Sequence, residues 1–190
     1  NSESVRATFT KIEPQPQDST SQGQSQEIVF DFNNDYATLF PTITGTSSSS
    51  DHGGDITEPV TATVGYVSVT VSPADTTVNK TPNRIWNVNP RLRMYSGTIT
   101  FTSVADSITK IVFTQTTNTS HVSDKNTVDS GELTTTDKTE NGTVIWKGDA
   151  KSVTFTIAGN TQINSITVAQ QDAKLEVETF DFNKESVPTS

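Results

Sequence analysis

Four side chains within one stretch of ten residues are of the kind that bind carbohydrate. Trp86 and Tyr95 offer flat aromatic faces, and Arg91 and Arg93 lie between them in the sequence. Aromatic faces cover the C–H surfaces of sugars, and neighbouring guanidinium groups hydrogen-bond to the hydroxyls. We therefore predict a ligand-binding site made of Trp86, Arg91, Arg93 and Tyr95.

The same residues also have a structural interpretation. Trp86 would then be a core side chain, and the two arginines would solvate an outer sheet face or pair with the carboxylates that the chain has in excess. Replacing Trp86 by alanine separates the interpretations, because unfolding indicates a core residue and loss of ligand without unfolding indicates a site. The second tryptophan, Trp146, is expected in the core or at a sheet edge.

Oxygen-bearing side chains raise the alternative of a calcium site. Four of them lie in residues 31–35, and Asp51 and Asp55 follow in a Ser-rich segment. Calcium prefers such hard oxygen ligands. Their spacing does not match an EF-hand loop, however, and clusters of Asn and Asp are ordinary turn chemistry. We therefore predict no metal site and no cofactor.

Catalytic chemistry has few candidates. The sequence has no cysteine, which excludes cysteine nucleophiles and thiolate zinc sites, and its two histidines, His52 and His121, both lie in polar segments. Carboxylate pairs for glycoside hydrolysis depend on spatial separation, but most glutamates here flank turns. We predict that the chain is not an enzyme.

Charge and hydropathy exclude two classes of partner. The formal net charge of −9 would repel a phosphate backbone, so we predict no nucleic-acid partner. No run approaches the ~20 apolar residues of a membrane helix, and we predict no membrane insertion. No signal segment opens the sequence, which fits a mature exported protein whose signal has been removed.

Short β-strands must position these residues. Apolar side chains alternate with Thr, Ser, Arg or Lys from Arg84 to Phe113, and a period of two indicates half-buried strands. Further strands are predicted at residues 27–33, 60–71, 131–135, 144–147, 152–157 and 162–168. Ser96-Gly97 is interpreted as a hairpin turn between strands at residues 92–95 and 98–102. Long polar loops are expected at residues 36–57 and 117–139.

Strands at intervals of about 8–12 residues, separated by turn residues, predict an all-β fold: an antiparallel β-sandwich. Thirteen apolar side chains are assigned to its two inner faces. They are Phe30, Phe32, Val69, Leu92, Ile99, Phe101, Ile111, Phe113, Val153, Phe155, Ile157, Ile166 and Val168.

The domain boundaries follow from composition. Residues 1–26 are rich in Ser, Gln and Pro and are predicted to be a linker, whereas residues 27–173 form the sandwich. Residues 174–190 are either a last strand or the start of a following repeat. Phe180-Asp-Phe-Asn echoes Phe30-Asp-Phe-Asn, which suggests a tandem copy, although coincidence in a Thr-rich chain also explains it.

Several short motifs occur in an order that resembles a known family. They include Phe30-Asp-Phe-Asn, Arg84-Ile-Trp, Leu92-Arg-Met-Tyr-Ser-Gly, Trp146-Lys-Gly-Asp and Ile163-Asn-Ser-Ile-Thr-Val. Residues 27–169 resemble a β-sandwich module that recurs, often in tandem, in secreted and surface proteins of Bacteroidetes-type bacteria. The resemblance implies export, a jelly-roll-like sandwich, and adhesion or carbohydrate binding. Residues 117–139 are longer and more polar than is usual in that family.

Taken together, the sequence predicts a non-catalytic module, secreted or at the cell surface, that binds glycans or supports adhesion next to neighbouring domains of the same chain. The alternative is a structural spacer in a larger surface protein. Exposed clustered aromatic residues would favour the first hypothesis, and fully buried ones the second. A hydrolase would require two carboxylates that face each other across a groove.

Overall fold

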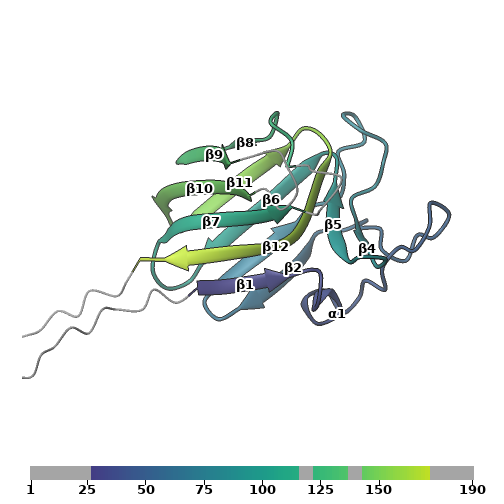
Figure 1. Cartoon of the computed structure of the whole chain (residues 1–190), viewed down its shortest axis with the longest axis horizontal. Helices are drawn as coiled ribbons and strands as arrows, with labels where there is room; N and C mark the ends of the chain where they lie inside the picture. The colour runs from purple at the N-terminus through teal and green to yellow at the C-terminus, as the bar shows by residue number, and fades with distance from the viewer. Residues whose placement is uncertain (1–26, 116–121, 137–142, 172–190) are drawn as a thin grey trace, which may run out of the picture.

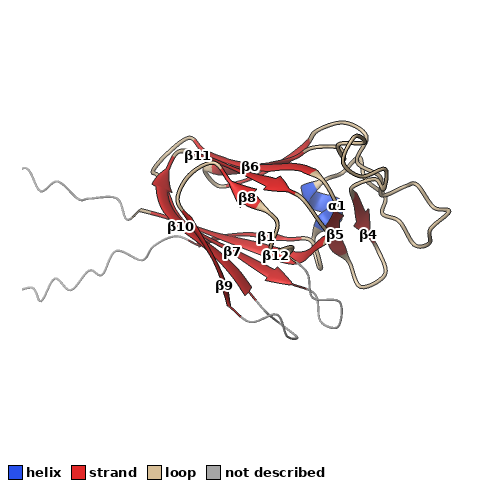
Figure 2. Ribbon diagram, turned by 90° about the horizontal axis from the view of Figure 1, so that it is seen from above, coloured by secondary structure: helices blue, strands red, loops and turns tan. Residues whose placement is uncertain are grey.

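Two antiparallel β-sheets pack face to face in the computed structural model, which describes residues 27–115, 122–136 and 143–171 (Figure 2). The larger sheet has the strand order β4-β5-β12-β7-β10-β9. β1 also pairs with β12, on the same side of that strand as β5 but farther along it. Its strands are β1 (Glu27–Asp31), β4 (Arg84–Trp86), β5 (Arg91–Met94), β7 (Ile108–Gln115), β9 (Glu132–Thr136), β10 (Thr143–Ala150) and β12 (Thr161–Gln170).

The smaller sheet has the order β2-β3-β6-β11-β8. Its strands are β2 (Val60–Val64), β3 (Val67–Val71), β6 (Gly97–Ser103), β8 (Thr127–Val128) and β11 (Ser152–Ile157). One short helix, α1 (Tyr36–Leu39), follows β1. The prediction of an antiparallel β-sandwich is confirmed.

The core lies between the two sheets and contains all thirteen predicted side chains. Phe101 is at its centre, with ring centroids 6.5 Å from Phe30, 6.0 Å from Phe113 and 5.9 Å from Phe155, all in edge-to-face geometry. Each large apolar side chain contributes about 1.5–3 kcal/mol on full burial. Trp146 is also fully buried, as predicted, and its Nε1 donates a 2.7 Å hydrogen bond to the Ser130 carbonyl.

The predicted hairpin at Ser96-Gly97 is wrong, because the chain changes sheets there. β5 belongs to the larger sheet and β6 to the smaller one. The side chain of buried Asn83 fixes this corner: it donates to the Ser96 carbonyl at 2.7 Å and accepts from the Tyr95 N–H at 3.0 Å. Gly97 has a φ of 85°, which suits a corner as well as a hairpin.

Two predicted strand boundaries also change. The alternating run at residues 60–71 is a hairpin of β2 and β3, with a turn at Gly65, where φ is 57°. The first strand ends at Asp31 instead of Asn33, because the Asp31 carboxylate accepts the N–H groups of Asn33 and Asn34, both at 3.0 Å. Side-chain bonds of this kind form turns in competition with the sheet ladder.

The sandwich has two distinct ends along β12. Arg93 pairs with Gln162 near the start of this strand, and Glu27 pairs with Ala169 near its finish. Seven residues of strand separate these positions, roughly 23 Å at 3.3 Å per residue. We call the end with β4, β5 and α1 the distal end, and the end with Glu27 and Gln170 the proximal end (Figure 1).

Several predictions fall outside the described residues. They concern the linker at residues 1–26, the echo at residues 180–183, the tail from residue 174, and His121. Of the long polar loop at 117–139, the described part contains β8 and β9, and β9 matches the predicted strand at residues 131–135. Within the described ranges, no helix is long and apolar enough to cross a membrane.

Candidate functional site

The pairing of β4 with β5 puts Trp86, Arg91 and Arg93 on one sheet face, and Tyr95 follows directly after β5. Trp86 lies opposite Arg91, and Arg84 lies opposite Arg93. Their neighbours along both strands, Ile85, Leu92 and Met94, are fully buried against the other sheet. Because side chains alternate along a strand, the aromatic and basic side chains therefore occupy the outer face of the larger sheet at its distal end.

The structure brings together all four predicted site residues. The Arg93 guanidinium carbon lies over the Trp86 ring at 4.9 Å from its centroid, and that of Arg91 lies over the same ring at 5.7 Å. Arg93 also lies 5.7 Å from the Tyr95 ring and donates a hydrogen bond from Nη2 to the Tyr95 hydroxyl. We call Trp86, Arg91, Arg93 and Tyr95 the aromatic–arginine cluster.

Trp86 is not the core residue of the structural interpretation. All four side chains of the cluster are partly exposed, and Trp86 is absent from the buried core. The arginines do not pair with the excess carboxylates either, since neither forms an ion pair within residues 27–115, 122–136 and 143–171. Trp86 and Tyr95 are therefore clustered and partly exposed, between the two outcomes that would favour a binding face or a spacer.

Gln162 is a neighbour of the cluster that the sequence did not indicate. Its Oε1 accepts a 2.8 Å hydrogen bond from Arg91 Nε, while Arg91 Nη1 donates to the carbonyls of Val88 at 3.0 Å and Asn89 at 2.9 Å. Gln162 lies on β12, 71 positions from Arg91, so only the strand pairing brings it here. These bonds fix the plane of the Arg91 guanidinium.

Two positive charges lie side by side in the cluster. Partial burial lowers the pKa of Arg91, and the charge of Arg93 lowers it further. Arg93 Nε is buried and has no acceptor among the described residues. The cluster thus holds cationic groups with unused donors on a chain that is strongly acidic overall.

The loop between α1 and β2 covers the edge strand β4. The Thr46 N–H donates to the Ile85 carbonyl at 2.8 Å, the Asn87 N–H donates to Thr46 at 3.0 Å, and the Ile85 N–H donates to Gly54 at 2.9 Å. A Cβ atom on Gly54 would lie 2.1 Å from the Ile85 carbonyl oxygen, so only glycine permits this contact. The loop satisfies the outer edge of β4 and thereby holds Trp86 in place.

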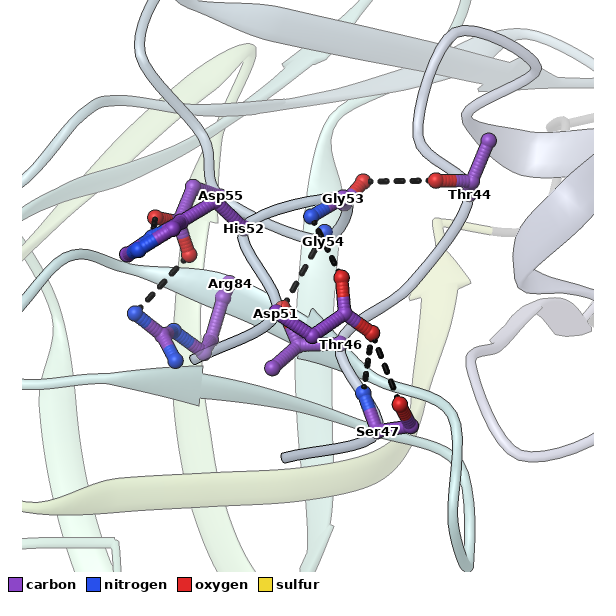
Figure 3. Close-up of polar contacts among 9 residues, drawn as sticks. All are labelled: Thr44, Thr46, Ser47, Asp51, His52, Gly53, Gly54, Asp55 and Arg84. Atoms are coloured by element: carbon purple, nitrogen blue, oxygen red, sulfur yellow. Dashed lines mark hydrogen bonds and ion pairs between the residues drawn. The ribbon is translucent and has the colours of Figure 1, made fainter. Parts of the chain in front are cut away.

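Asp51 organises the turn within this loop (Figure 3). Its carboxylate accepts hydrogen bonds from the N–H of Gly53 at 2.9 Å and from the N–H and hydroxyl of Ser47, both at 2.8 Å. The bonds to the Gly53 and Ser47 amides lower the pKa of Asp51 from 3.8 to about 2. Hydrogen bonds to the charged form have this effect on a carboxyl group.

A buried ion pair joins the loop to β4. Arg84 Nη2 lies 2.9 Å from Asp55 Oδ1, with both side chains only 9% exposed. The imidazole of His52 lies 2.7 Å from the other oxygen of Asp55 and is 71% exposed (Figure 3). Asp55 is thus occupied by structural contacts, and no hydroxyl among the described residues is hydrogen-bonded to the His52 ring.

An open pocket of about 350 Å³ lies beside this loop. It is lined by Thr42, Ile43, His52, Gly53, Asp55, Thr57, Glu58 and Val60. The described residues contain no group of three or more His, Cys, Asp or Glu side chains that could hold a metal ion. Asp31 and Asp51 instead hold turns, and Asp55 pairs with Arg84.

Comparison with known proteins found no match to this chain among family models, curated proteins or solved structures.

Proposed function

We propose that this chain is a non-catalytic module, secreted or at the cell surface, that binds carbohydrate through the aromatic–arginine cluster. The observation that carries the proposal is the arrangement of Trp86, Arg91, Arg93 and Tyr95 as one cluster of partly exposed side chains outside the core. The core between the sheets is made of the apolar side chains of the inner faces, and the cluster lies outside it. Two aromatic rings and two guanidinium groups gathered on an outer face therefore point to recognition of a ligand.

The cluster is rigid before any ligand arrives. Arg91 is tied to Gln162 and to two carbonyl groups, and Arg93 is tied to Tyr95 and lies over the Trp86 ring. Side chains that are already ordered lose little conformational entropy on binding, which favours affinity from a small contact area. The remaining guanidinium N–H groups are donors for sugar oxygens, and the aromatic edges offer apolar contact.

The position of the cluster favours binding over the spacer alternative. Glu27 and Gln170 both lie at the proximal end, whereas the cluster lies at the distal end, roughly 23 Å away along β12. A spacer that lengthens a stalk would join its neighbours at opposite ends. A module connected at one end presents the other end to a ligand.

The experiment is a glycan array probed at high protein concentration, followed by calorimetry with each hit. Affinities of a single module can be as weak as ~1 mM, about −4 kcal/mol, so millimolar sugar is needed. Trp86→Ala should abolish binding. The matched control is Tyr66→Ala, which removes a 56% exposed aromatic side chain from the β2–β3 turn at the proximal end and should bind normally.

An array with no hit from well-folded protein would refute the proposal and favour the spacer. A hit that survives Trp86→Ala would place binding elsewhere, and the pocket beside Asp55 and Glu58 would be examined next.

A further inference from the structure

We infer that the ligand of the aromatic–arginine cluster is an acidic glycan, one that carries carboxylate or sulfate groups. This inference rests on the proposed function and names the class of sugar.

The first argument is the local charge. The chain has 22 acidic and 13 basic side chains, yet Arg91 and Arg93 lie together with no carboxylate paired to either within the described residues. The nearby Arg84 is already paired with Asp55. Arg91 and Arg93 differ from exposed cations in that both are partly buried and both lie over the same ring, so their charges are neighbours that one external anion could neutralise.

The second argument is the number of unused donors. A guanidinium carries five N–H groups in a planar fork that matches the oxygens of a carboxylate or sulfate. Within the described residues, Arg91 uses three donors and Arg93 uses one. An anion that accepts from both arginines would also favour the charged form of Arg91, whose pKa is lowered by partial burial and further by the charge of Arg93.

The third argument is that the two guanidinium groups already cover the aromatic face of Trp86. Both guanidinium groups lie over the Trp86 ring, so a neutral sugar that stacks its C–H surface there would have to displace one of them. An acidic sugar instead binds to the guanidinium groups where they are. The ring then holds the cations in position through cation–π attraction while the cations contact the ligand.

The experiment is calorimetry of the intact chain with three probes: a galacturonic acid trisaccharide, the methyl ester of the same trisaccharide, and a sulfated disaccharide. We expect at least one acidic probe to bind about tenfold or more tightly than the neutral ester. Its affinity should decrease when the salt concentration is raised from about 0.05 M to about 0.5 M, because salt screens exposed charges. The uronate and the sulfated probe distinguish carboxylate from sulfate recognition.

Arg93→Gln should reduce the affinity for the acidic probe about tenfold or more. The matched control is Lys110→Gln, which removes an exposed positive charge from β7 of the same sheet and should leave the affinity within about twofold. Equal losses in both variants would overturn the inference, because the overall charge would then attract the ligand.

The failures of the two proposals differ. If the ester binds as tightly as the acid, and Trp86→Ala abolishes both, the ligand is a neutral glycan and only this inference falls. If neither these probes nor any array glycan binds the folded protein, the proposed function falls together with it.

Discussion

The two tryptophans give the sharpest test of the site, because the structure assigns them different roles. Trp86 is partly exposed at the sheet surface, whereas Trp146 is fully buried and donates to the Ser130 carbonyl. Replacing each by alanine removes the same atoms. The resulting losses in the free energy of unfolding should differ clearly.

The magnitudes follow from the contacts. Trp86→Ala removes two cation–π contacts, at 4.9 and 5.7 Å, worth about 0.5–1 kcal/mol each at an exposed site. Adding roughly 1 kcal/mol for the remaining apolar contacts of its partly exposed ring gives about 2–3 kcal/mol. Trp146→Ala leaves a cavity in the core, which costs about 3–5 kcal/mol. It also leaves the Ser130 carbonyl without its hydrogen-bond donor, which costs about 1 kcal/mol more.

The assay is urea unfolding followed by far-ultraviolet circular dichroism, since each substitution removes half of the tryptophan signal. Domains have unfolding free energies of about 5–15 kcal/mol, so Trp86→Ala should remain folded and Trp146→Ala should be near or beyond its limit. A loss for Trp86→Ala as large as that for Trp146→Ala would refute the reasoning, because Trp86 would then act as a core residue.

Two further predictions concern the loop that covers β4. Gly54→Ala should lower the free energy of unfolding by about 1–3 kcal/mol, because the added Cβ would lie 2.1 Å from the Ile85 carbonyl oxygen. It should also speed hydrogen exchange at the Ile85 amide, which donates to Gly54, and unchanged exchange there would contradict the prediction. The Asp51 carboxyl has a pKa lowered to about 2, so its stabilisation of the loop is complete above pH 3.8 and is lost as the pH falls through about 2. The amide resonances of Ser47 and Gly53 should titrate with that midpoint and lose the transition in Asp51→Asn, whereas a midpoint near 3.8 would show that these hydrogen bonds do not form in solution.

The core residues were predictable because they lie in a local pattern. A period of two in the sequence specifies which side chains face inward, and all thirteen assigned residues are buried. The spacing of Arg91 and Arg93 likewise puts them on one face of β5, and Tyr95 follows directly after its end. The candidate site itself was predicted from residue types.

The pairing of distant segments was not predictable in this way. A Ser-Gly step suits a hairpin and a corner equally, and the choice at Ser96-Gly97 depends on the buried Asn83 side chain that holds the corner. Similarly, no local signal connects Arg91 with Gln162, or Arg84 with Asp55, since each contact is made across strands or loops.

The sequence by itself determined the sandwich, its inner faces and the residue types of the candidate site, because these depend on alternation and composition. Only the tertiary structure decided that Trp86 lies beside the core instead of in it. It also decided that the arginines lie over its ring without a carboxylate partner among the described residues. The physical reason is that burial and charge pairing depend on which strands become neighbours. That choice is made by packing of the whole chain, which no short stretch encodes.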